Sequence, residues 1–253
     1  MLKSARQTQI RKLVEANGHV TVSELNLLLD VSEATIRRDL EALAQSGWVR
    51  RTHGGAISVE RASEEPPIFH RQSEYHIEKQ RIGQQAATLV GEGETIFLGS
   101  GTTVHEVARN ISDVPGLTVI TNALNVINEV VECDNVELIV IGGMFRQSEL
   151  SMVGHIAEQA IREFRADKVI MGMRGIDPVH GFTSDYMPEA ITDRAILSIA
   201  PCNIIVADRS KLGRVSTVFL APITSAHVLI TDQSAPLEIV SEIRELGLEV
   251  QLV

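Results

Sequence analysis

The sequence predicts a small N-terminal winged helix-turn-helix and a larger C-terminal α/β domain, whose mainly parallel sheet is covered by helices on both faces. Three short amphipathic segments and a basic extended segment fill residues 1–57, and short apolar strands alternate with helical segments over residues 75–253. Between them, residues 58–74 lose apolar periodicity and contain Pro66 and Pro67, so we expect a linker there.

The first two predicted helices form the scaffold of the small domain. Their apolar residues at helical spacing are Ile10, Leu13, Val14, Leu25, Leu28 and Leu29. Asn17 and Gly18 supply a stop signal after the first helix, and Ser23 is a candidate N-cap for the second, over residues 21–29. Only residues 30–31 separate this helix from the third, which is the tight connection of a helix-turn-helix.

The third predicted helix has the pattern of a DNA-recognition helix. Ser32 is a strong N-cap, and on a helix that starts there Ile36, Leu40 and Leu43 face inward while Ala34, Arg37, Arg38 and Glu41 face outward. Two adjacent exposed arginines can reach phosphates or the acceptor edge of guanine, and Thr35 can meet a phosphate or a thymine methyl. Paired arginines most often form only a solvated face, and that alternative stays open when Arg37 and Arg38 are taken alone.

A basic wing follows the recognition helix. Residues 48–51 are expected to be extended, and Gly54 and Gly55 can turn the chain back as a hairpin tip. Together with the scaffold, this wing favours contact with DNA. The residues predicted to contact DNA are Ser32, Thr35, Arg37, Arg38, Arg50, Arg51, His53 and Gly54.

The distribution of charge supports DNA binding through the small domain alone. Residues 1–56 carry eight Lys or Arg against six Asp or Glu, a net charge of +2, and the whole chain carries −10, so residues 57–253 carry −12. A strongly acidic remainder repels DNA, which makes general coating of nucleic acid improbable.

Composition excludes several other classes. No apolar run approaches the roughly 18 residues that span a bilayer, and we expect no secretion signal before Lys3. Cys133 and Cys202 lie in no paired motif, so we expect a reducing cytoplasm and no disulfide. The eight histidines show no metal-binding spacing, and we expect no structural metal.

The α/β fold of the larger domain is predicted from the alternation of strands and helices along the chain. Its expected strands are residues 95–98, 117–121, 136–141, 168–171, 203–207, 228–231 and 248–253. Its expected helices are residues 75–90, 104–111, 122–132, 154–164, 189–199 and 237–246.

Loops at the carboxyl ends of these strands are the expected binding site, because ligands of open α/β sheets lie there. Ser100, Gly101, Thr102 and Thr103 follow the first strand and offer hydroxyl and backbone N–H donors at a helix start, which suits a phosphate, and Lys211 can neutralise it. The local alternatives are an ordinary capped turn and a solvated loop lysine.

Other strand ends add polar groups. Thr121 and Asn122 follow the second strand and Gly142 and Gly143 the third, beside the first loop. Asp185 and Glu189 are acceptors suited to sugar hydroxyls, although two carboxylates near a helix start are also ordinary caps.

Two other phosphate motifs do not match. There is no Gly-x-x-x-x-Gly-Lys-Ser/Thr pattern, which excludes a P-loop. A dinucleotide fingerprint needs glycine where Val104 stands and an acidic residue where Thr121 stands, so NAD is disfavoured and we expect no cofactor.

The chain resembles the DeoR family of bacterial transcription regulators over nearly its full length. The matching motifs are Ser32-x-x-Thr-Ile-Arg-Arg-Asp39, His53-Gly-Gly-Ala56, Gly101-Thr-Thr103, Thr121-Asn122, Gly142-Gly143 and Asp208-x-Ser-Lys-x-Gly213. The resemblance implies a C-terminal sensor domain, similar to ribose-phosphate isomerases and CoA transferases, that binds phosphorylated sugars. Gly99 stands where many members have Asp, and Arg194 where many have Lys.

We therefore expect a regulator, most often in this family a repressor of a sugar operon, that leaves its operator when a phosphorylated sugar binds. Two recognition helices read a site well, so we expect a homodimer or homotetramer. The rival hypothesis is a sugar-phosphate isomerase with a DNA-binding appendage, in which Asp185 and Glu189 act as acid and base. It is disfavoured because no dense group of acids and lysines surrounds the phosphate loop.

Overall fold

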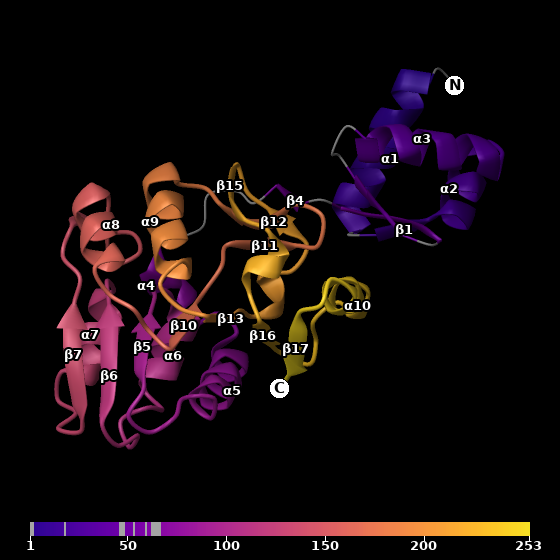
Figure 1. Cartoon of the computed structure of the whole chain (residues 1–253). Helices are drawn as coiled ribbons and strands as arrows, with labels where there is room; N and C mark the ends of the chain where they lie inside the picture. Colours follow the sequence, from indigo (N-terminus) through magenta and orange to yellow (C-terminus); the bar gives the residue numbers. More distant parts are fainter. Residues whose placement is uncertain (1–2, 18, 46–48, 53, 59, 62–66) are drawn as a thin grey trace. The chain divides into compact units, whose positions relative to one another are not determined.

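The computed structural model describes residues 3–17, 19–45, 49–52, 54–58, 60–61 and 67–253. The chain divides into two compact units, Met1–Arg61 and Ala62–Val253, and each is described by itself (Figure 1). The described helices and strands of the smaller unit are α1 (Lys3–Asn17), β1 (His19–Thr21), α2 (Val22–Leu29), α3 (Glu33–Gln45), β2 (Val49–Arg51), β3 (Gly55–Ser58) and β4 (Glu60–Arg61).

The smaller unit is a winged helix-turn-helix, as the sequence predicts. In its described part, strands β1, β3 and β2 pair antiparallel in that order, and the three helices pack on an apolar core that includes Ile10, Leu25, Ile36 and Leu40. The short strand β1 was not predicted, since three residues carry too little periodicity. Thr21, not Ser23, caps α2: its Oγ1 accepts from Glu24 N at 3.2 Å, and Glu24 Oε2 accepts from Thr21 N at 2.8 Å.

Residues 67–253 form the larger unit around a parallel sheet of seven strands. In spatial order these are β17 (Glu249–Leu252), β16 (Val228–Thr231), β13 (Cys202–Val206), β10 (Lys168–Met171), β5 (Thr95–Leu98), β6 (Leu117–Thr121) and β7 (Val136–Val140). The helices are α4 (Ile68–Arg71), α5 (His76–Ala87), α6 (Thr102–Ala108), α7 (Leu124–Val130), α8 (His155–Arg162), α9 (Met187–Leu197) and α10 (Leu237–Glu245). All seven strand predictions are correct to within one residue at either end.

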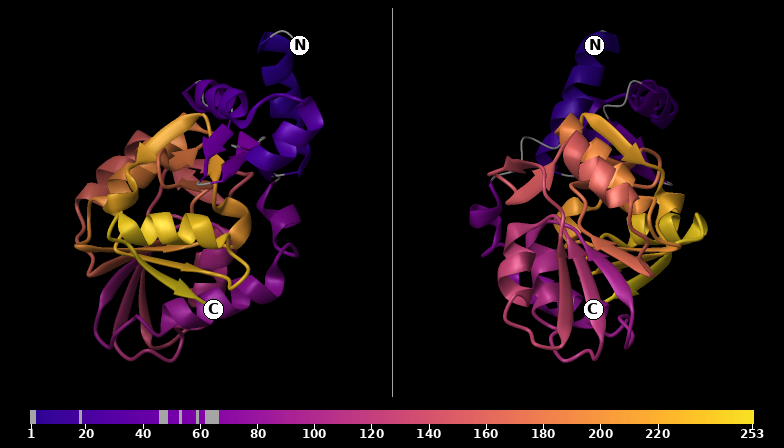
Figure 2. Two further views of the ribbon diagram at one scale, coloured as in Figure 1. Left: turned by 90° about the vertical axis from the view of Figure 1, so that its right-hand side faces the viewer. Right: turned by 60° about the vertical axis from the view of Figure 1, so that its left-hand side comes forward.

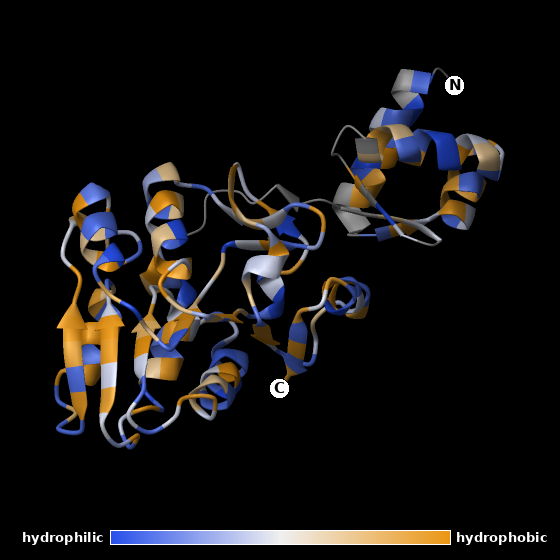
Figure 3. Ribbon diagram, viewed as in Figure 1, coloured by the Kyte–Doolittle hydropathy of each residue, from blue (hydrophilic) through white to orange (hydrophobic). Residues whose placement is uncertain are grey.

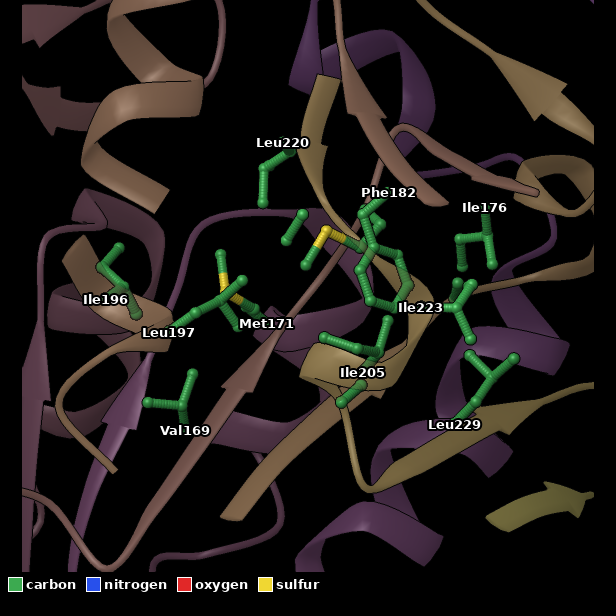
Figure 4. Packing of buried hydrophobic residues seen from close by; sticks show 14 of the residues in the cluster. Val169, Met171, Ile176, Phe182, Ile196, Leu197, Ile205, Leu220, Ile223 and Leu229 are labelled. Carbon is green, nitrogen blue, oxygen red and sulfur yellow. The ribbon is translucent and has the colours of Figure 1, made fainter. Parts of the chain in front are cut away.

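Helices cover both faces of this sheet, as Figure 2 shows and as the alternation of side chains along each strand requires. Ile96, Leu98 and their counterparts on other strands pack with α5, α6 and α7. Phe97, Met171 and their counterparts pack with α8, α9 and α10. Figure 3 shows the resulting apolar strands, and Figure 4 shows the second cluster around Phe182, Met171 and Ile205.

Antiparallel strands extend this sheet domain beyond the predicted elements. These are β11 (Gly175–Asp177), β12 (Gly181–Ser184) and β15 (Val218–Ala221) in one small sheet and the hairpin β8 (Met144–Arg146) with β9 (Ser151–Val153); the short strand β14 is Arg214–Val215. Helix α4 also falls where a linker was expected: Ile68 is fully buried and its N–H donates to Ser148 O at 2.8 Å. Residues 68–71 therefore belong to the packed larger unit. None of the helices in the described ranges is long and apolar enough to cross a membrane.

Candidate nucleic-acid surface and ligand cleft

The recognition helix α3 begins as the Ser32 cap predicts. Thr35 N donates to Ser32 Oγ at 3.3 Å, and the two hydroxyl oxygens lie 2.9 Å apart. Ile36 and Leu40 are fully buried and hold the inner face of the helix on the core. The opposite face is therefore free to present Arg37 and Arg38, which are both exposed.

Basic residues of the helix and the wing come together on one surface. Arg37, Arg38, Glu41, Ala42 and Arg51 line a shallow hollow. Arg37 Nη2 is 3.4 Å from Glu33 Oε2, an exposed pair that a phosphate can displace with little loss. The hollow therefore joins three guanidinium groups, with Glu41 as its acidic member.

The wing turns as a hairpin between β2 and β3. Thr52 N donates to Gly55 O at 3.2 Å, and Arg51 Nη1 donates to the same oxygen at 3.1 Å. Glycine is required at position 55, because a Cβ there would lie 1.9 Å from Val20 O. Gly54 is exposed, and its carbonyl accepts from Val22 N at 2.8 Å. His53 and the side chain of Arg50 lie outside the described residues.

The larger unit has a cleft at the point where the strand order reverses. β5 is followed along the chain by β6 on one side, whereas β10 lies on its other side. In open α/β sheets this crevice, beyond the carboxyl ends of the strands, is where ligands bind. The cleft is lined after β5 by Ser100, Gly101, Thr102 and Thr103, after β10 by Gly172, Met173 and Arg174, and after β13 by Ala207, Asp208, Ser210 and Lys211.

The loop after β5 presents donors to the cleft. Gly101 has φ 125°, which favours glycine, and the space that a Cβ would occupy is open. Asn125 Nδ2 donates to Gly101 O at 3.2 Å and fixes the loop. Burial, and the nearby Arg214 charge, lower the pKa of Lys211 to about 8. The side chain of Lys211 is thus still mostly charged at neutral pH, and its positive charge would attract an anion into the cleft.

A network of arginines and carboxylates also contributes to the cleft lining. Glu149 accepts from Arg71 and lies 2.6 Å from Arg174 Nη2. Arg174 also reaches Asp185 at 3.1 Å and Glu189 at 3.3 Å. Burial by itself would lower the pKa of Arg174, but the surrounding carboxylates, Glu189 foremost, raise it above its usual value. Arg174 therefore stays charged and ties three acidic side chains together.

Asp193 is a further acidic residue of the cleft lining. It lines the cleft on α9, and burial together with the charge of Glu189 raises the pKa of its carboxyl well above the usual range. Glu189 itself is held by Arg146 Nη1 at 2.6 Å.

Only some of the predicted binding residues line the cleft. Ser100, Gly101, Thr102, Thr103, Glu189 and Lys211 do; Thr121, Asn122, Gly142, Gly143 and Asp185 do not. The loops after β6 and β7 lie on the other side of β5, away from β10, so they sit beyond the crevice. Thr121 Oγ1 instead donates to Leu98 O, and Asn122 Nδ2 donates to Met152 O. A Cβ at Gly143 would press on Val153 O at 3.0 Å, which indicates a packing role.

Several cleft residues were not predicted. They are Arg71, Lys79, Glu149, Arg174, Asp193 and Asp208. Arg174 follows strand β10 by three positions, so the rule applied to the loop after β5 would have found it. Asp208 opens the Asp208-x-Ser-Lys-x-Gly213 motif after β13, so the same rule would have found it as well. Arg71, Lys79, Glu149 and Asp193 lie in segments without a recognisable motif, and only the packing of α4, α5, α9 and the β8–β9 loop brings them together.

The arrangement defines a two-unit regulator: a winged helix-turn-helix with a basic surface, joined to an α/β domain with a polar ligand cleft. Residues 6–62 match the DeoR-like helix-turn-helix domain, and residues 74–233 match the DeoR C terminal sensor domain. The chain belongs to the DeoR family, and it is a DNA-binding transcriptional repressor rather than an enzyme.

Relatives match over nearly the full chain. The transcriptional repressor AccR of Agrobacterium fabrum is 34% identical over 90% of this chain and 88% of its own. The glycerol-3-phosphate regulon repressor of Escherichia coli is 31% identical over 100% of both chains. Among solved structures, ribose 5-phosphate isomerase A from Methanocaldococcus jannaschii aligns with a TM-score of 0.41 at 14% identity, over 55% of each chain.

Proposed function

We propose that the protein represses an operon for the uptake or catabolism of a sugar and that a phosphorylated sugar, bound in the cleft, releases it from operator DNA in the cytoplasm. The observation that carries the proposal is the meeting of the loop after β5 with Lys211 in a cleft that also contains Glu189 and Asp193. One end offers donors for an anion, and the other offers partners for hydroxyl groups.

The phosphate end consists of Ser100, Gly101, Thr102, Thr103 and Lys211. N–H groups in the first turn of a helix have no partner within it, and the two threonine hydroxyls add donors beside them. Thr102 and Thr103 are each 7% exposed, so a phosphate bound there would be largely shielded from water. Hydrogen bonds to a charged group contribute about 1.5–3 kcal/mol each, which an uncharged sugar would forfeit. One relative is named for glycerol 3-phosphate, a phosphorylated polyol, and this supports the same class of effector.

On DNA, α3 enters the major groove, where Arg37 and Arg38 meet bases or phosphates, with Ser32 and Thr35 at the helix start. Arg50, Arg51, His53 and Gly54 of the wing meet the phosphate backbone. A homodimer or homotetramer presents two such units to half-sites separated by whole helical turns.

Calorimetric titration of sugars against their phosphates tests the effector class. Glucose and glucose 6-phosphate, fructose and fructose 6-phosphate, and glycerol and glycerol 3-phosphate form matched pairs, with a band-shift assay of operator release alongside. At least one phosphate should bind and release DNA at concentrations where its free partner does neither. Equal affinity for both members of every pair would refute the phosphate site.

A further inference from the structure

Part of the cleft wall is built from the segment that directly follows the join between the two units. The smaller unit ends at Arg61, and α4 begins at Ile68. Arg71 at the end of α4, Glu74, and Lys79 on α5 all line the cleft. The chain that leads to the DNA-binding unit therefore starts in the wall of the ligand cleft.

Hydrogen bonds to one neighbouring turn help to hold helix α4 in the cleft wall. Its four residues are too short to be stable alone, and no side chain caps its start. Ile68 N donates to Ser148 O, and the Arg71 guanidinium donates to the carboxylate of Glu149, the residue after Ser148. Both bonds go to the same turn between β8 and β9, and the fully buried side chain of Ile68 adds packing to them.

Lys79 holds the other end of the same segment. Its side chain is buried, and Nζ donates to Arg71 O at 2.6 Å and to Glu74 O at 2.7 Å. The bonds order the turn between α4 and α5. Arg71 and Lys79 thus fix the position of α4 with positive charges that also face the cleft.

An anion that enters the cleft must compete for these charges. Glu149 is 4% exposed and shares its two carboxylate oxygens between Arg71 and Arg174. One guanidinium can bind a carboxylate or a phosphate bidentately, but it cannot serve both fully. Arg174 pairs with Glu149, Asp185 and Glu189, whereas the pair of Arg71 with Glu149 joins α4 to the β8–β9 turn. Arg71 is therefore the guanidinium whose exchange would change how α4 is held.

We propose that Arg71 is a ligand of the effector anion and that its exchange between Glu149 and the anion transmits occupancy of the cleft to the chain leading into the DNA-binding unit. This rests on the proposed function, since it needs an anionic effector. We therefore expect α4 to move or loosen when an anion is bound. The β5–α6 loop, by contrast, binds the anion but does not pass the change on to the DNA-binding unit.

Hydrogen exchange of the full-length protein, with inorganic phosphate as the probe, tests this coupling. Phosphate should increase amide exchange over residues 68–75 in the parent protein, and calorimetry on the same sample should detect binding. Arg71→Met should weaken phosphate binding by about ten- to a hundredfold and abolish the change in exchange. Arg81→Met, an exposed arginine on α5, is the matched control and should behave as the parent.

Glu149→Gln gives a second readout that needs no ligand. It removes one charge of the pair that fixes α4, so exchange over residues 68–75 should already be raised without phosphate. Phosphate binding with unchanged exchange in the parent, or parent-like binding by Arg71→Met, overturns the coupling and leaves the proposed function intact. Failure of inorganic phosphate and of every sugar phosphate to bind the parent overturns both.

Discussion

Arg6 Nε donates to Asp39 Oδ2 at 2.5 Å, although the two residues are 33 positions apart. Gln7 Nε2 donates to the other oxygen of the same carboxylate at 3.1 Å. Asp39 is 1% exposed and follows Arg37 and Arg38, which face outward. Helix α3 thus has its ion pair to α1 next to the two exposed arginines that we propose contact DNA, and this ion pair helps to set the direction in which they point.

Removal of that anchor should destabilise the smaller unit. Asp39→Ala leaves the Arg6 guanidinium without its carboxylate, and the free energy of unfolding should fall by about 1.5–3 kcal/mol, the usual value for a hydrogen bond to a charged group. Trp48, the only tryptophan, belongs to this unit, so urea unfolding followed by its fluorescence reports on the change. Glu41→Ala, exposed on the same helix, should unfold as the parent does. Equal stability of the two variants would contradict the anchor.

Substitution of the outward arginines should remove operator binding without loss of fold. Arg37→Ala or Arg38→Ala deletes contacts worth about 1–3 kcal/mol each, which corresponds to roughly five- to 150-fold in affinity. Band-shift titration at one fixed salt concentration measures this. Arg162→Ala, an exposed arginine on α8 of the other unit, is the control. Parent-like affinity of the double variant would show that α3 is not the reader.

Substitution of Glu41 should have the opposite effect and strengthen operator binding. It lines the hollow with Arg37, Arg38 and Arg51, so its carboxylate opposes an approaching phosphate. Glu41→Gln should therefore bind operator about two- to fivefold more tightly at low salt, and the gain should shrink as salt is added. A loss of affinity would indicate that Glu41 itself contacts DNA.

Effector binding should weaken as the pH rises. The pKa of Lys211 is lowered to about 8, so its ammonium loses its proton as the pH passes that value, while a phosphate monoester stays doubly charged. Affinity should be highest below pH 8 and should fall towards tenfold per pH unit above it. Calorimetry of the effector between pH 7 and 9 checks this, with Lys211→Met expected to bind weakly and nearly independently of pH. A profile in the parent that does not change between pH 7 and 9 would remove Lys211 from the anion site.

Damage to the cleft should produce a repressor that no longer responds. Thr103→Val deletes a hydroxyl donor but keeps the shape of the side chain, so the protein should bind operator normally and release it only at effector concentrations roughly tenfold higher. Thr88→Val, an exposed threonine at the end of α5, controls for the substitution. The paired measurement is operator affinity with and without effector. Loss of operator binding in Thr103→Val alone would point to misfolding of the loop.

The strands of the sheet could be predicted because each is a short apolar run between turn signals. Their order could not, since pairing of β5 with β10 is a long-range event that leaves no local pattern. The order of the strands explains which of the predicted binding residues line the cleft. The loop after β5 lines the cleft, whereas Thr121 and Asn122 follow β6, on the side of β5 away from β10. Arg71, Glu149 and Asp193 were missed because each lies in a different element, and only packing joins them.

The position of β10 beside β5 also governs how the protein is made. A ribosome releases the winged helix-turn-helix first, then β5, β6 and β7, which pair with their neighbours in the order of synthesis. The crevice is complete only when β10 adds to the other edge of β5 and β13 then adds to β10. Lys211, which lines it, follows the end of the DNA-binding unit by 150 residues. A nascent chain thus contains the whole DNA-binding unit well before its ligand cleft is complete, and chains truncated during synthesis would be expected to bind DNA without responding to any ligand of the cleft.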